Sequence, residues 1–194
     1  MMEEEIQSEE HKTISDFWPS IAVSGGIFGV IIFALGLVFG YMQINAEPTG
    51  AILSPLMLSG VVICLVVALA GGVAIWHYTK EETPYVKLGQ GALIGFLTGA
   101  VLVVVSTVLN ELWHFIDPDY TQKMMEATIA NIEAMDMPAE QKQMMIDSTA
   151  ETMRAQQSIF QQILYGIPMY GILNLITGMI AVKIFGKKKE QETF

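Results

Sequence analysis

Glu111 and His114 are the residues whose types and spacing come closest to a known kind of chemical site. They stand three positions apart, so a helix would place both on one face, and Asp117 and Asp119 follow them. Helical di-metal centres use this Glu-x-x-His step, but they take ligands from several helices, and this chain holds one such step. We therefore interpret the pair as polar residues at the end of a membrane helix, with a metal site as the alternative.

Methionine is concentrated in one part of the chain, because seven of the 13 methionines fall between residues 110 and 158. Thioether sulfur is a soft ligand for Cu(I), so one hypothesis is copper handling. Methionine also fills the cores of small helical units and forms adaptable partner surfaces, and we favour these two roles over copper. The seven are Met124, Met125, Met135, Met137, Met144, Met145 and Met153.

Asn174 is the strongly polar side chain near the middle of the last apolar segment. Such a residue usually makes a hydrogen bond to another helix, worth about 0.6 to 2 kcal/mol, and we expect Thr98 or Ser106 as the partner. In a transporter, Asn174 and Thr98 could instead contact a solute. The apolar segments contain no charged residue, which argues against ion-coupled transport and proton pumping.

Other kinds of chemistry find little support. There is no glycine-rich phosphate loop and no plausible Ser-His-Asp set, and the single cysteine, Cys64, lies among apolar residues. His77 lies between Trp76 and Tyr78 and is interpreted as an interfacial anchor rather than a proton relay. A formal net charge of −10 disfavours nucleic acid. We expect a protein that is not an enzyme and has no cofactor.

Four long apolar stretches must position these residues. The chain is 52% hydrophobic, with a mean hydropathy of +0.45, and each stretch is long enough as a helix to cross a hydrocarbon core of about 30 Å. The sequence predicts an all-α integral membrane four-helix bundle over residues 17–186. The predicted spans are about 21–41, 53–78, 88–109 and 163–182. An acidic tail, 1–16, is expected to be disordered, and a basic tail covers 187–194.

The segment 110–158 between the third and fourth spans is the main part expected outside the membrane. Tyr120 to Ala134 places apolar residues at helical spacing, and Pro138 stands where a second helix could begin. We expect a helical hairpin or one kinked helix.

Basic residues near the span ends predict the orientation. The side that holds both termini has seven lysines, whereas the opposite side has two lysines and one arginine. This bias places both termini in the cytoplasm and the loop 110–158 in the periplasm. The seven are Lys12, Lys80, Lys87, Lys183, Lys187, Lys188 and Lys189, and the three are Lys123, Lys142 and Arg154.

Small residues predict where the helices pack closely. Gly91, Gly95 and Gly99 recur at steps of four, which leaves one face of the third span bare. The first span carries glycines at the same depth, so close packing should concentrate in the cytoplasmic half, with a looser outer half. These glycines are Gly25, Gly26 and Gly29.

Four spans with a helical loop before the last resemble the bacterial membrane family catalogued as domain of unknown function 4199. The similarity covers about residues 20–189. Its better-matched pieces are KLGQGALIGFLTG, ELWHFIDPDY and ILYGIPMYGILNLITGMIAVKIFGKKK, with Gly91, Gly95, Trp113, Pro118, Asp119, Tyr120, Pro168 and Gly171. The resemblance implies an inner-membrane protein with no established activity.

Two functional hypotheses follow. The first is a non-enzymatic inner-membrane scaffold whose outer loop contacts a partner protein, another copy of the chain or the membrane surface, in addition to the lipid bilayer. The alternative is an accessory for small-solute or lipid transport that uses a polar site near Asn174.

Overall fold

All regular secondary structure in the described part of the chain is α-helical, and no strand is found there. The structure, a computed structural model, describes residues 14–50, 55–156 and 158–187. The expectations for most of the acidic tail and of the basic tail concern residues 1–13 and 188–194, which lie outside the described residues. The elements are α1 (Ile14–Ile44), α2 (Pro55–Glu81), α3 (Leu88–Trp113), α4 (Tyr120–Glu133), α5 (Ala139–Gln156) and α6 (Ile159–Phe185).

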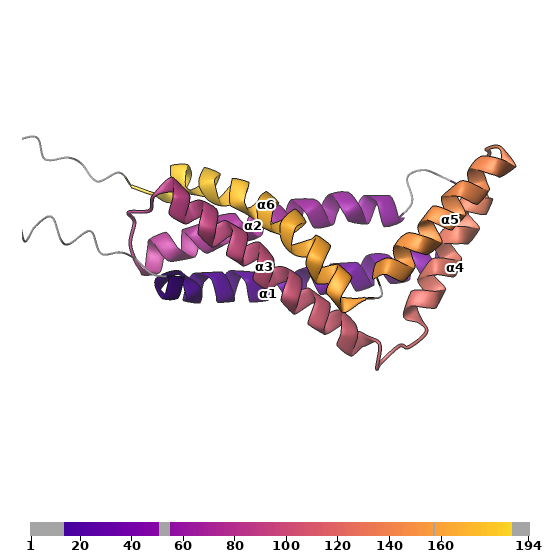
Figure 1. Cartoon of the computed structure of the whole chain (residues 1–194), viewed down its shortest axis with the longest axis horizontal. Helices are drawn as coiled ribbons and strands as arrows, with labels where there is room; N and C mark the ends of the chain where they lie inside the picture. Colours follow the sequence, from indigo (N-terminus) through magenta and orange to yellow (C-terminus); the bar gives the residue numbers. More distant parts are fainter. Residues whose placement is uncertain (1–13, 51–54, 157, 188–194) are drawn as a thin grey trace, which may run out of the picture.

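Four of these helices, α1, α2, α3 and α6, are long and apolar enough to cross a membrane. They run side by side as an antiparallel bundle, so α1 begins and α6 ends at the same end, here called the terminal end (Figure 1). The opposite end, which carries α4 and α5, is called the hairpin end. The predicted four-span membrane bundle is confirmed. Each helix ends beyond its predicted span, and α1 and α6 also begin before theirs, because helices continue into the interfacial region that surrounds the hydrocarbon core. The predicted first residues of the second span, 53 and 54, lie outside the described residues.

α3 lies at the centre of the bundle and packs most extensively against α6 and α1. A buried apolar cluster at the terminal end joins all four spans and the link before α3. Its members are Phe17, Ile21, Ala74, Ile75, Tyr78, Val86, Ile94, Ala181 and Val182. A second cluster lies nearer the hairpin end, and it consists of Ile32, Val67, Ala70, Leu102 and Val103.

Pro168 lies in the interior of a span. The span predicted from about residue 163 would place Pro168 in or next to its first turn, but α6 begins at Ile159 and continues through it. That expectation is wrong. Proline lacks the N–H that would bond to Leu164. A membrane helix tolerates this loss because neighbouring groups or local adjustments satisfy the freed carbonyl.

The segment between α3 and α6 forms two helices, α4 and α5, which lie side by side and project beyond the bundle (Figure 1). Of the two forms expected from the sequence, the hairpin is the observed one. The turn that joins the helices is held by Lys142, whose Nζ donates to the carbonyl of Glu133 at 2.7 Å and whose backbone N–H bonds to Pro138. Thr128 and Ile132 are the buried residues of α4.

Candidate functional site

The glycines of α3 bring it against the backbone of α6. A Cβ atom on Gly99 would lie 2.6 Å from the carbonyl oxygen of Tyr170, and one on Gly95 would lie 2.8 Å from the carbonyl carbon of Asn174. A Cβ on Gly91 would meet the side chain of Val182. Real Cβ atoms do not approach other atoms so closely, and backbone atoms cannot move aside. Only glycine permits this approach of the two helices.

α1 uses two of its glycines in the same way. A Cβ on Gly25 would lie 2.8 Å from the side chain of Val101, and one on Gly29 would lie 2.7 Å from that of Val105. Gly26 differs, because a Cβ there would have nothing within 4 Å. Gly26 lies one position, about 100° of helix rotation, from Gly25, so it shares the depth of the packed glycines but not their face.

Asn174 is fully buried and joins α6 to α2. Its Oδ1 accepts from the backbone N–H of Gly71 at 2.6 Å, and its Nδ2 donates to the carbonyl of Tyr170 at 2.8 Å. The expected partners on α3 are wrong, because each hydroxyl bonds within its own helix. Thr98 Oγ1 donates to Ile94, and Ser106 Oγ donates to Val103. A short hydroxyl on a helix reaches its own preceding turn more readily than a neighbouring helix.

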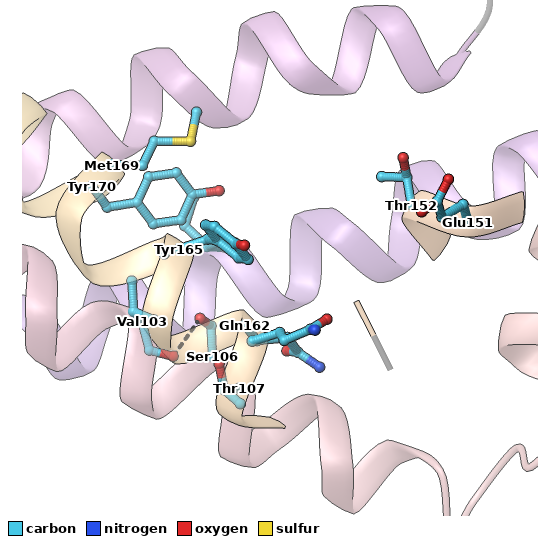
Figure 2. Close-up of a pocket in the computed structure, with 12 residues that line it drawn as sticks. Val103, Ser106, Thr107, Glu151, Thr152, Gln162, Tyr165, Met169 and Tyr170 are labelled. Atoms are coloured by element: carbon cyan, nitrogen blue, oxygen red, sulfur yellow. Dashed lines mark hydrogen bonds between the residues drawn. The ribbon is translucent and has the colours of Figure 1, made fainter. Parts of the chain in front are cut away.

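A cavity of about 600 Å³ lies in the half of the bundle nearer the hairpin end. Figure 2 shows Tyr165, Met169 and Tyr170 extending from α6, with Glu151 and Thr152 of α5 across an open space. No described residue of α2 lines it. The lining comprises Ile32 of α1, Val103, Ser106 and Thr107 of α3, Glu151 and Thr152 of α5, and Gln161, Gln162, Tyr165, Gly166, Met169 and Tyr170 of α6.

The rim of this cavity faces the membrane. Tyr165 is 71% exposed and Met169 is 63% exposed, and both share a helix face with the exposed Ile172 and Ile176. In a membrane-spanning helix, an apolar stripe of this kind contacts lipid. The lining does not include Asn174, which lies one helical turn closer to the terminal end than Tyr170.

Polar and aromatic contacts attach the hairpin to α1. Tyr41 Oη donates to Asp117 Oδ2 at 2.7 Å, and Lys123 Nζ lies 3.0 Å from Asp117 Oδ1. The Tyr41 hydroxyl and the Lys123 ammonium hold the pKa of the Asp117 carboxyl below its usual value, and the same carboxylate raises the pKa of Lys123. The Tyr41 ring packs against the rings of Trp113 and Tyr120, with centroids 6.4 and 5.3 Å apart.

Two close backbone approaches complete the attachment. The Tyr120 hydroxyl donates to the carbonyl of Gly36 at 3.4 Å, and a Cβ on Gly40 would collide with that hydroxyl. After α1, the Gly50 N–H donates to Asn131 Oδ1 at 3.2 Å. Gly50 has a φ of 66°, and a side chain there would also strike the backbone of Ala134. Contacts at both ends of α4 therefore attach the hairpin to α1 and to the link that follows it.

α5 presents the open face of the hairpin. Met144 is 59% exposed and Met145 is 39% exposed. The carboxylates of Glu140, Asp147 and Glu151 on the same helix are exposed as well. The other five methionines of the segment are half-buried. Both roles that we favour for the methionines, core and exposed surface, therefore have candidates.

The metal alternative gains no geometric support. Glu111 and His114 are half-buried at the end of α3, and within the described ranges no group of three His, Cys, Asp or Glu side chains is placed to hold a metal ion.

At the terminal end, His77 Nδ1 lies 2.9 Å from Ser20 Oγ as a hydrogen-bonded pair that joins α2 to α1. Its neighbour Trp76 is 45% exposed, with the Lys80 ammonium 5.2 Å from its ring, as an interfacial anchor requires. Tyr78 is instead buried against Phe17, with ring centroids 5.3 Å apart.

The sequence does not reveal the hydrogen bonds of Asp117 and Gly71, nor the burial of the Gln161 side-chain oxygen. Asp117 stands out as a polar residue after a span, but nothing local indicates that Tyr41 is its partner. Gly71 contributes its backbone N–H to Asn174, and a sequence pattern of side chains does not indicate which backbone N–H groups make such bonds. Gln161 falls just before the span predicted from about residue 163, and its buried Oε1 has no hydrogen-bond partner among the described residues.

Comparison with known proteins gives one match. A family model described as "Protein of unknown function (DUF4199)" matches residues 22–183, which include all four apolar helices and the hairpin. Neither the curated proteins nor the solved structures contain a match.

Proposed function

Because the chain belongs to the DUF4199 family of proteins of unknown function, its activity has to be argued from its own geometry, and we propose that it is a non-enzymatic scaffold of the bacterial inner membrane. In this proposal the four spans anchor and orient the hairpin, and α5 binds a partner protein outside the cytoplasm.

The orientation rests on charge. In the sequence, seven lysines belong to the tails and the link on the side of the two termini and three basic residues to the other side, which supports cytoplasmic termini and a periplasmic hairpin. The exposed Trp18, Trp76 and Tyr85 at the terminal end agree with a membrane interface there.

The observation that carries the proposal is the rigid attachment of the hairpin. A loop that only connects two spans has no need of the Asp117 contacts to Tyr41 and Lys123, nor of the Gly50 contact to Asn131. These contacts order α4, and α4 in turn supports α5. A binding surface that is already ordered loses less conformational entropy when it binds, so its affinity is higher.

The exposed surface indicates the chemistry of the partner. Residues 110–158 hold nine carboxylates against three Lys or Arg side chains, a net charge of −6. This charge favours a basic protein surface and opposes docking on anionic lipid headgroups. Met144 and Met145 add flexible apolar area within the acidic face. We therefore favour a basic partner protein over a second acidic copy or the membrane surface.

Two matched charge reversals test the proposal. Asp147 on α5 and Glu126 on α4 each accept an exposed hydrogen bond from a glutamine four residues earlier, at 2.9 and 2.8 Å. Tagged full-length protein, purified from native membranes in mild detergent, should retain a stoichiometric basic partner. Asp147→Lys should abolish its retention, whereas Glu126→Lys, the same charge reversal on α4, should not. Purification without such a partner, equal loss in both variants, or association only with a second copy would contradict the proposal.

Transport at Asn174 is the alternative. The structure offers transport no specific support, because Oδ1 and Nδ2 of Asn174 are both hydrogen-bonded and the cavity lining does not include this residue. Transport would require a solute path that reaches Asn174, and uptake into vesicles that Asn174→Leu abolishes would favour it.

A further inference from the structure

The cavity between α1, α3, α5 and α6 has the size and the polarity gradient of an amphiphile site. Its volume of about 600 Å³ lies within the range of about 300–1,000 Å³ that ligand pockets occupy. The inner part is lined by Ile32, Val103 and Tyr170, whereas Glu151 and Thr152 line it from the extramembrane helix α5. A ligand that fits this gradient has an apolar chain and a polar head.

The route of entry points to lipid. The exposed rim residues Tyr165 and Met169 lie on the membrane-facing stripe of α6, so the cavity opens sideways toward the acyl chains. Figure 1 shows the first turns of α2 well apart from α6 in this half of the bundle. A chain from the leaflet on the hairpin side can enter without crossing water.

Two polar groups indicate the head. Gln161 is one of the residues that line the cavity, and its Oε1, which is shielded from solvent in this structure, has no hydrogen-bond partner in the described part of the chain. Glu151 brings a carboxylate to the same lining. Both groups accept hydrogen bonds, so they select a head that donates them, such as a primary ammonium.

We propose that this cavity binds one acyl chain of a lipid from the hairpin-side leaflet, with an ethanolamine-type head held by Glu151 and Gln161. The site shares Glu151 with the acidic face of α5 but does not depend on the partner proposal. The partner test changes Asp147, whereas the lipid test changes Glu151 and Gln161, so either proposal can fail alone.

The headgroup provides a matched pair of probes. Oleoyl lysophosphatidylethanolamine and oleoyl lysophosphatidylcholine share chain, phosphate and charge, but only the ethanolamine ammonium has N–H donors. Titration of each probe into the full-length protein in detergent should give at least about tenfold tighter binding of the ethanolamine lipid, the ratio expected from one charge-assisted hydrogen bond. Equal affinities, or no binding of either probe, would overturn the proposal.

Substitutions in the cavity lining test whether the lipid binds at this site. Gln161→Leu and Glu151→Gln should each reduce the preference for ethanolamine, whereas Glu140→Gln, the same change elsewhere on α5, should leave it intact. Ser106→Phe should fill the cavity and weaken both probes at least tenfold, with Val61→Phe on the lipid-exposed face of α2 as the control for added bulk. If Ser106→Phe does not fold, Met169→Trp at the rim serves the same purpose. Unchanged preference in both headgroup variants would refute the assignment.

Discussion

Alanine at Gly95 should destabilise the bundle, although alanine is ordinarily the better helix residue. The new Cβ would lie 2.8 Å from the carbonyl carbon of Asn174 and 3.2 Å from the Cα of Leu175, where ordinary contacts begin at 3.4 Å. Every atom that it meets belongs to the backbone of α6, so no side chain can rotate away. α6 must retreat by at least the difference, about 0.6 Å.

The magnitude follows from a matched comparison with Gly36, where a Cβ would have nothing within 4 Å. Both substitutions gain the same helix propensity, about 1 kcal/mol, so this gain cancels. Overpacking at Gly95 costs about 1–3 kcal/mol. The retreat of α6 also strains the hydrogen bond from Gly71 to Asn174, worth about 0.6 kcal/mol on average in membranes. Gly95→Ala should therefore be about 1.6–3.6 kcal/mol less stable than Gly36→Ala.

Reversible unfolding of the purified protein in mixed detergent micelles measures this difference, with helix content followed by circular dichroism. Leucine at the same two positions should widen the contrast and show it in thermal stability as well. Equal stability of the Gly95 and Gly36 variants would refute the argument that backbone contact between α3 and α6 organises the bundle.

Two further predictions concern the polar contacts. The pKa of Asp117 is lowered in the folded state, so its contacts with Tyr41 and Lys123 contribute fully above its ordinary pKa of about 3.9 and are lost as the pH falls through the lower folded value. Hydrogen exchange of α4 should accelerate in that window and should be fast at every pH in Asp117→Asn; identical exchange in both proteins would contradict this. Asn174→Ala should cost about 0.6–2 kcal/mol in the micelle unfolding assay, because the bond from Gly71 is lost, and an unchanged stability would count against that bond.

The main features of the fold could be predicted because they rest on local signals. Long charge-free runs specify membrane helices, and Pro138 marks the start of α5. The small-residue period of α3 correctly identified a closely packed face. It could not identify which helix covers that face, because period and depth are properties of one helix.

The site residues show the same limit. Asn174 was recognisable as a polar group in need of a partner, but its acceptor oxygen meets a backbone N–H at Gly71, which carries no sequence signal. For the cavity, the sequence predicts only that the outer half of the bundle is more loosely packed. Its lining combines four helices and depends on where α6 begins, and that boundary was placed at about residue 163 instead of Ile159.

The difference between the two ends of the bundle also affects the bilayer around it. At the terminal end, residues of all four spans meet in one buried cluster, whereas toward the hairpin end α2 and α3 diverge (Figure 1). We therefore expect the helices to occupy more membrane area in the hairpin-side leaflet than in the other. Crowded copies of such a protein favour a curved membrane with the hairpins on its convex face.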